Sequence, residues 1–122
     1  MNEENKMNLT EKHCRPCEGG VPPLTEDEEN ALMNDLDGWD IERKGVHRIY
    51  KTWLLPTFIK AIEFVNEIAR LAEEEGHHPE FIINYRRVTV ELSTHAILGL
   101  SENDFILASK IDLLTPAHHH PH

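Results

Sequence analysis

The sequence predicts an α+β fold, a two-layer arrangement of a four-stranded antiparallel sheet with three helices packed on one face, in the order αββαββα. Residues 39–53 and 81–93 each contain two alternating apolar and polar runs with a short break between them, which is typical of β-hairpins. Three other segments, 25–36, 57–75 and 101–114, carry helix caps or apolar residues at helical spacing. Helices with one apolar face need a shared sheet surface, and the open face and edges of that sheet favour self-association.

The first helix is expected to begin after Thr25 and to end before Asp37-Gly38. Thr25 and Glu28 have the spacing of a capping box, in which the Thr25 hydroxyl accepts from the Glu28 amide and the Glu28 side chain reaches back. The acidic first turn also suits the helix dipole. Such a helix would bury Ala31, Leu32 and Leu36.

The first hairpin is expected to pair Trp39–Arg43 with Val46–Trp53 around the turn residues Lys44-Gly45. The second strand has two mixed faces: one carries Val46, Arg48, Tyr50 and Thr52, and the other carries His47, Ile49, Lys51 and Trp53. Since neither face is wholly apolar, this pattern leaves open which of them meets the core.

The longest helix is expected from about Thr57 to Glu75. Pro56 suits its start, because the first turn loses little from a missing amide hydrogen. Gly76 is the expected left-handed stop. The apolar stripe is wide: Phe58, Ala61, Ile62, Val65, Ile68, Ala69 and Ala72, broadened by Phe64 and Leu71.

The second hairpin pairs Phe81–Tyr85 with Val88–Ser93, although Arg86-Arg87 suits a two-residue turn poorly. If the alternation continues, His95 lies on the polar side with its imidazole available at the end of the strand. Ser101 is the expected N-cap of the last helix. That places Asp104 at the third helical position, where a carboxylate supports the cap and the dipole.

The chain divides into an extended or partly disordered N-terminal arm at 1–23, an α+β domain at 24–115 and a polar, His-rich tail at 116–122. A length of 122 residues supports one domain with a modest core. The net charge of −10 argues against nucleic acid and against anionic membrane surfaces. No apolar run approaches the ~20 residues of a spanning helix, and the start lacks a signal-peptide pattern, so we expect a cytoplasmic protein.

Titratable side chains concentrate where the longest helix should stop. Glu73-Glu74-Glu75-Gly76 leads directly into His77-His78-Pro79, and His95 follows the second hairpin. Adjacent residues of an extended segment point to opposite sides, so His77 and His78 should have different tasks. Spacing alone leaves three interpretations open: catalysis, metal binding, or ordinary surface histidines. A zinc site would want a clear fourth ligand, which is absent.

Two cysteines, Cys14 and Cys17, lie in the arm. Their spacing is compatible with a redox pair or with half of a zinc site. However, the strand and helix that flank a redox motif are missing, as is a second pair of ligands. A loop with two thiols is the plainer interpretation. The tail histidines His118 to His120 and His122 are interpreted as an unstructured surface segment.

The spacing of the site residues resembles the signature of the pterin-4a-carbinolamine dehydratases: Glu73, His77-His78-Pro79, Tyr85, His95 and Asp104. Further similar elements are Cys17-Glu18-Gly19-Gly20, Pro22-Pro23-Leu24-Thr25, Gly38-Trp39, Ser93-Thr94-His95, Gly99-Leu100-Ser101 and Leu107-Ala108-Ser109. The resemblance runs from about Cys14 to Leu114. Small departures are Phe81, where the family often has Trp, and Arg86, where it often has a turn Asn.

The resemblance implies the same α+β fold and a hydro-lyase that dehydrates 4a-hydroxytetrahydropterin to quinonoid dihydropterin and water, in tetrahydrobiopterin recycling. It implies no metal and no organic cofactor. An imidazole, with an unperturbed pKa of about 6.5, suits both proton transfers that the reaction needs. By resemblance, His77 and His95 are the acid/base pair and His78 mainly holds the pterin. Pro79 shapes the turn, and Glu73 and Asp104 lie at the rim.

The resemblance also implies partners and an alternative function. A homodimer or homotetramer is expected, together with a functional link to an aromatic amino-acid hydroxylase that supplies the substrate. Some relatives are dimerisation cofactors of a transcription factor or assist protein assembly, so a dehydratase-like assembly protein is the alternative. Retention of all three histidines favours catalysis, because a scaffold would not need them. A metal-binding protein that uses Cys14, Cys17 and the histidines is the third hypothesis.

Overall fold

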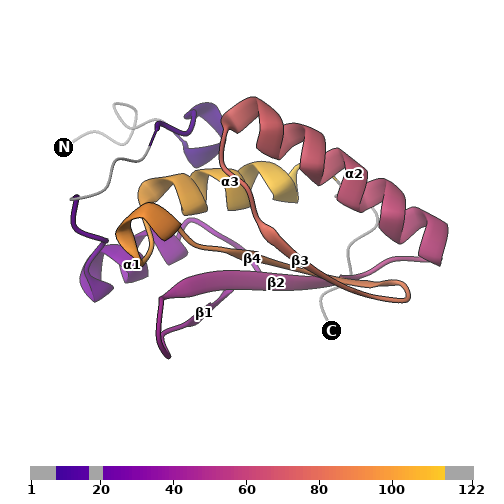
Figure 1. Ribbon diagram of the computed structural model, residues 1–122, viewed down its shortest axis with the longest axis horizontal. Helices are drawn as coiled ribbons and strands as arrows, with labels where there is room; N and C mark the ends of the chain where they lie inside the picture. Colours follow the sequence, from indigo (N-terminus) through magenta and orange to yellow (C-terminus); the bar gives the residue numbers. More distant parts are fainter. Residues whose placement is uncertain (1–7, 17–20, 115–122) are drawn as a thin grey trace.

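The computed structural model describes residues 8–16 and 21–114 (Figure 1). Within these ranges the helices are α1 (Glu26–Met33), α2 (Phe58–Glu75) and α3 (Glu102–Asp112), and the strands are β1 (Asp40–Glu42), β2 (Arg48–Leu54), β3 (Glu80–Asn84) and β4 (Arg87–Leu92). Two 3-10 turns are present in the same ranges, η2 (Leu9–Glu11) and η3 (His95–Ile97). None of the described helices is both long enough and apolar enough to cross a membrane.

The four strands form one sheet in the order β1-β2-β4-β3, and each neighbouring pair is antiparallel. Figure 1 shows α2 and α3 lying across one face of this sheet. The predicted α+β fold is therefore confirmed. The sheet register also determines where the site forms. Because Glu80 at the start of β3 pairs with Glu91 near the end of β4, the residues before Glu80 lie beside those that follow Glu91.

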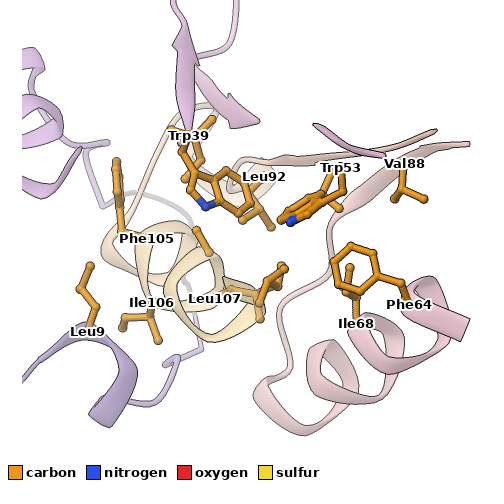
Figure 2. Close-up of a cluster of buried hydrophobic side chains, with 14 of the residues drawn as sticks. Leu9, Trp39, Trp53, Phe64, Ile68, Val88, Leu92, Phe105, Ile106 and Leu107 are labelled. Atoms are coloured by element: carbon orange, nitrogen blue, oxygen red, sulfur yellow. The ribbon is translucent and has the colours of Figure 1, made fainter. Parts of the chain in front are cut away.

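The core lies between the sheet and the helices (Figure 2). The Trp53 ring meets Phe64 edge-on at 5.0 Å and Trp39 at 5.7 Å between centroids. Each such aromatic pair contributes about 0.5–1.5 kcal/mol beyond the area it buries. The sheet and α3 supply much of the remaining apolar surface: Ile49, Val88, Val90, Leu92, Phe105, Leu107 and Ile111.

Lys51 resolves the question of the two mixed faces of β2. Ile49, Lys51 and Trp53 are all buried, so their face meets the helices. Lys51 is only 4% exposed, yet its Nζ donates hydrogen bonds of 2.9 Å to the Asp37 carbonyl and to Asp112 Oδ1. A buried ammonium is tolerated when it is paired in this way. The partners lie far from Lys51 in sequence, so strand alternation alone could not identify the core face.

The first helix follows the predicted start but differs at its end. Both halves of the Thr25–Glu28 capping box form. The helix stops at Met33 rather than near Leu36, and Ala31 is exposed. Glu29 is buried in its place, where its carboxylate accepts from Arg43 Nε at 2.9 Å and pairs with His47 Nδ1 at 2.8 Å. This ion pair, rather than an apolar stripe alone, holds α1 to the first hairpin.

The turn of the second hairpin lies one residue earlier than Arg86-Arg87. Asn84 pairs with Arg87, which leaves Tyr85 and Arg86 as the loop, and Tyr85 has a φ of 57°. Positive φ is unusual for a residue with a side chain. The Tyr85 ring stacks on Phe58 with 6.4 Å between centroids, and Arg86 Nη1 donates to the Leu55 carbonyl at 3.0 Å. These contacts support a turn that its residue types do not predict.

The described part of the N-terminal arm packs against the domain. Leu9 of η2 is 7% exposed and lies near Ile106 of α3 in Figure 2. The Cys14 amide donates to Glu75 Oε1 at 2.8 Å, at the end of α2. Residues 1–7, 17–20 and 115–122, which include Cys17 and the His-rich tail, lie outside the described residues. The division into arm, domain and tail stays a prediction.

Gly99 is expected to tolerate no larger side chain, because a Cβ there would lie 2.6 Å from the Cβ of Pro23. The backbones on both sides are fixed: Thr94 donates to the Gly99 carbonyl at 2.8 Å, and Leu24 donates to the Leu100 carbonyl at 2.9 Å. We expect Gly99→Ala to lower the free energy of unfolding by about 1–3 kcal/mol in urea titrations. The loss should shrink in a Pro23→Gly background. Equal losses in the two backgrounds would contradict the clash.

Candidate active site

Two of the candidate histidines, His77 and His78, lie immediately after the end of α2. Gly76 adopts φ 67°, and the amides of Gly76 and His77 donate to the carbonyls of Glu73 and Ala72. Nothing lies within 4 Å of a Cβ built on Gly76, so the left-handed backbone rather than crowding favours glycine here. The predicted helix stop is confirmed. His77-His78-Pro79 follow it without an intervening loop, and β3 begins at Glu80.

His95 follows β4, the last of the described strands, at the start of a 3-10 turn. β4 ends at Leu92, Thr94 forms an isolated bridge with Gly99, and η3 begins at His95. The strand alternation therefore does not extend to His95, and the 3-10 turn exposes its side chain instead. The register of Glu80 with Glu91 places this turn beside the residues that follow α2.

The three histidines border one open hollow of about 260 Å³, lined also by Arg15, Gly76, Ser93, Thr94, Ala96 and Asn103. A second hollow of about 220 Å³ shares His78, Ser93 and His95 with it. Pro79, Arg48, Glu80 and Glu91 complete the second lining. The structure thus brings His95 together with His77, His78 and Pro79, which precede it by 16 residues or more.

Asp104 lies beneath the hollow rather than at its rim. It is fully buried, and its Oδ1 is 2.6 Å from His77 Nε2. Its Oδ2 accepts the Ser101 amide at 3.0 Å and the Thr94 hydroxyl at 2.8 Å. The sequence left a cap and a site role open for Asp104: the cap forms, while the site role stays a prediction that the contact with His77 supports. Asp104 is connected to the hollow through His77 and Thr94, which both line it.

His77 and His78 have different partners, as their adjacency suggested. His77 is 11% exposed and contacts the buried Asp104. His78 Nε2 is 2.6 Å from Glu73 Oε2, but both side chains are mostly exposed, at 60% and 77%. An exposed pair of this kind adds little stability. Its effect is to hold the His78 ring at the mouth of the hollow.

Cys14 is poorly suited to redox or metal chemistry. Burial, together with the neighbouring Glu75 carboxylate, raises the pKa of the Cys14 thiol to about 12. The thiolate is the form that attacks or binds metal, and it is scarce at neutral pH with such a pKa. Among the described residues, no group of three or more His, Cys, Asp or Glu side chains is arranged to hold a metal ion.

Glu75 joins the arm to the end of α2. Burial by itself would raise its pKa, but hydrogen bonds from the Cys14 amide, His13 and Lys110, together with the Lys110 charge, outweigh burial and lower it. The carboxylate is 5% exposed and lies 3.2 Å from Lys110 Nζ. A depressed pKa means that the folded protein stabilises the ionised form.

We therefore expect Glu75→Gln to lower the free energy of unfolding by about 1–3 kcal/mol at neutral pH. Because the folded pKa is below the unfolded one, this contribution is present above the ordinary carboxyl range near pH 4 and is lost as pH falls through the folded pKa. Denaturant titrations from pH 7 to pH 3 should show wild type and variant converging. Glu74→Gln on the exposed side of α2 is the matched control and should change little. A constant difference across this range would contradict the linkage.

Sequence patterns did not single out Arg15, Thr94 or Asn103 as part of the site. Thr94 lines the hollow and donates to Asp104, a contact that alternation along β4 cannot predict. Asn103 lies in the first turn of α3, where its carboxamide bonds to the backbone of Arg15. No sequence signal marked Asn103, whose burial is visible only in the structure, or Arg15, whose segment lacks a regular apolar pattern.

Known proteins are similar to this chain in sequence and in fold. Residues 22–114 match the family model described as pterin 4 alpha carbinolamine dehydratase. A Rickettsia bellii protein named "Putative pterin-4-alpha-carbinolamine dehydratase" is 50% identical over 107 residues, which cover 87% of this chain and 93% of that protein. A Brucella melitensis crystal structure described as a transcriptional coactivator/pterin dehydratase has a TM-score of 0.70 and 35% identity, over 75% of this chain and 96% of that chain.

A more distant structure is a pterin dehydratase-like protein identified as a RuBisCO assembly factor in the alpha-carboxysome. Its TM-score is 0.55 at 22% identity, with 64% of this chain and 89% of that chain covered, so this likeness supports the fold alone. The fold is therefore an α+β domain of the pterin dehydratase type, with a hollow bordered by His77, His78 and His95. The chain belongs to the pterin 4 alpha carbinolamine dehydratase family, as the resemblance predicted, and membership supports a dehydratase-type function.

Proposed function

We propose that this protein is a hydro-lyase that converts 4a-hydroxytetrahydropterin to quinonoid dihydropterin and water by histidine acid/base catalysis. One observation carries the proposal: His77, paired with the buried Asp104, shares a hollow with His95, whose imidazole has no hydrogen-bond partner among the described residues. Two proton carriers are what the reaction needs, because one proton must leave the pterin and another must reach the departing oxygen. In this proposal the enzyme acts in the cytoplasm, in tetrahydrobiopterin recycling after an aromatic amino-acid hydroxylase.

His77 is assigned as the base. An ionised carboxylate only accepts hydrogen bonds, so the 2.6 Å contact with Asp104 requires the proton of His77 to be on Nε2. Nδ1 of the neutral ring then carries a lone pair, and it has no hydrogen-bond partner among the described residues. When Nδ1 takes the proton from N5 of the pterin, Asp104 offsets the new positive charge. A buried carboxylate behind an imidazole performs both tasks, holding the tautomer and stabilising the imidazolium.

His95 is assigned as the acid. Its ring makes no hydrogen bond with any described residue, and it is exposed, so it can exchange protons with solvent. In the proposed step the C4a–O bond breaks while His95 protonates the departing hydroxyl, which leaves as water. The electron pair freed at N5 forms the C4a=N5 double bond. No electrons enter or leave the pterin overall, so the step requires neither an oxidant nor a reductant.

The remaining candidates bind the substrate or position the residues that do. His78 lines both hollows and is oriented by Glu73, so it is proposed to hold the pterin. Pro79 lines the second hollow and fixes the chain between His78 and β3. Glu73 acts on the pterin through His78 or directly at the rim. Asp104 supports the site from below as a positioning residue rather than by contact with the ligand.

The direct test supplies carbinolamine freshly made by a hydroxylase and follows the absorbance of the quinonoid product. Catalytic amounts of the protein should accelerate dehydration above the spontaneous rate. Absence of acceleration at any protein concentration would reject the proposal. His13→Ala offers a control for general effects of losing a histidine, since His13 lies outside this hollow.

An assembly protein remains the second candidate, and one surface favours it. β3 is an edge strand, and Ile82 and Ile83 on it are 51% and 42% exposed. Exposed apolar edge strands are sites of pairing with another chain. We propose that the chain uses this edge to form a homodimer or homotetramer. Analytical sedimentation should give the mass of two or four chains, and a mass of one chain would contradict this proposal. Capture of a stoichiometric protein partner, with no activity in the carbinolamine assay, would favour the assembly function over catalysis.

A further inference from the structure

The N-terminal segment contributes an arginine to the hollow from a fixed backbone. The Asn103 carboxamide holds Arg15 from both sides: its Oδ1 accepts the Arg15 amide at 3.0 Å, and its Nδ2 donates to the Arg15 carbonyl at 2.6 Å. The preceding Cys14 amide is bound by Glu75, and Leu9 is inserted in the core. The position of the Arg15 backbone therefore does not depend on a ligand.

The Arg15 side chain is exposed and lines the same hollow as His77, His78 and His95. It forms no ion pair with a carboxylate of the described residues, whereas two nearby lysines are paired, Lys12 with Glu102 at 2.5 Å and Lys110 with Glu75 at 3.2 Å. The chain as a whole carries a net charge of −10. The overall negative charge repels anions, and an arginine without a carboxylate partner among the described residues provides a local attraction for them at the hollow.

We propose that Arg15 is a substrate-contacting residue that makes the hollow prefer pterins whose ring substituent carries a carboxylate or phosphate over pterins with a neutral side chain. This inference rests on the proposed function, since it places a pterin among the histidines. In this proposal the histidines meet the reacting edge of the ring, and Arg15, which lines the same hollow, meets the substituent. A guanidinium presents a planar pair of N–H donors that matches the oxygens of a carboxylate or phosphate, and charge-assisted pairs of this kind are the stronger hydrogen bonds.

Oxidised pterins are stable and fluorescent, so equilibrium binding can test the preference apart from turnover. The probes are 6-carboxypterin, neopterin 3′-monophosphate and the neutral 6-hydroxymethylpterin, titrated at pH 8 and at low salt, where charge interactions are least screened. Wild type should bind the anionic probes about tenfold more tightly than the neutral one, a difference of about 1.4 kcal/mol. Tighter binding of 6-carboxypterin alone would place the preferred charge next to the ring, and tighter binding of neopterin 3′-monophosphate alone would place it at the end of the side chain. Either result would support the proposal.

Arg15→Gln should bring the affinities for anionic and neutral pterins to within about twofold of each other while leaving the neutral affinity unchanged. Arg15→Lys should keep part of the preference, because the charge remains and the planar fork is lost. Raising the salt concentration should weaken the wild-type preference. Arg70→Gln is the matched control, because Arg70 is an exposed arginine on α2 that lines none of the hollows described above.

Equal binding of all probes to wild type would overturn this inference and leave the dehydratase proposal standing. A preference for anionic probes that survives Arg15→Gln would overturn it as well. An equal loss of affinity for neutral and anionic probes in that variant would also overturn it, because it would indicate that Arg15 stacks on the pterin ring. Failure of every pterin to bind, together with no acceleration in the carbinolamine assay, would overturn both proposals.

Discussion

Replacement of His77 or His95 by alanine is expected to lower kcat for carbinolamine dehydration by about 10²–10⁴ each, the range that a positioned general acid or base supplies. The two losses should differ in how they respond to added imidazole. His95 is exposed, so a small acid from solvent can occupy its place. His77 is 11% exposed and held by Asp104, so rescue should be weaker there. Stopped-flow measurement with freshly generated carbinolamine provides the rates.

His78→Ala is the informative companion to these variants. Its ring lies at the mouth of the hollow and pairs with an exposed carboxylate, so its removal should raise KM more than it lowers kcat. Equal kcat losses in all three variants would contradict the division of tasks between proton transfer and binding. Rates unchanged by both His77→Ala and His95→Ala would remove these residues from the chemistry altogether.

The parts of the fold that the sequence predicts well are those set by local physics. The capping box at Thr25, the helical stripe of α2 and the left-handed stop at Gly76 each depend on residues within one or two turns of one another. The same locality explains why the position of His77 and His78, just after a helix, was predictable. The α+β architecture followed because hairpins and one-faced helices leave few ways to cover a sheet.

The missed features depend on distant partners. Lys51 is buried because Asp37 and Asp112 reach it, and no pattern in β2 contains that information. The turn at Tyr85 requires a positive φ, which a tyrosine rarely adopts, and its ring stacks on Phe58, a residue of another element. Arg15 reaches the hollow through hydrogen bonds with a residue near the other end of the chain. Pairing of this kind is set by tertiary structure.

Asp104 combines a local and a distant role. Its place three residues after Ser101 predicts the cap, and the amide of Ser101 does donate to it. Its contact with His77 could not be derived from spacing, because the two residues lie on different elements. The resemblance to a family predicts a site role for Asp104, and in the structure its carboxylate contacts His77 and Thr94, which both line the hollow.

Asp104→Asn is therefore expected to lower kcat by about 10²–10⁴ while leaving substrate KM nearly unchanged, because it should reverse the His77 tautomer. An asparagine has one accepting and one donating end. If its Oδ1 keeps the Ser101 amide and the Thr94 hydroxyl, its Nδ2 faces His77 and donates. His77 Nε2 must then accept, Nδ1 carries the proton, and the base is lost. The lost charge in a buried network should also cost about 1–3 kcal/mol in the free energy of unfolding.

Two comparisons separate catalysis from stability in this variant. Ser101→Ala removes a hydroxyl that pairs with Thr94 at 2.8 Å but leaves the Asp104–His77 contact, so it should cost about 1 kcal/mol with kcat near wild type. Nitrogen NMR shifts of the His77 ring report the tautomer directly, and they should exchange between Nδ1 and Nε2 in Asp104→Asn alone. If Asp104→Asn keeps the wild-type tautomer and kcat, then Asp104 serves α3 as a cap only, and the base at Nδ1 of His77 must be abandoned.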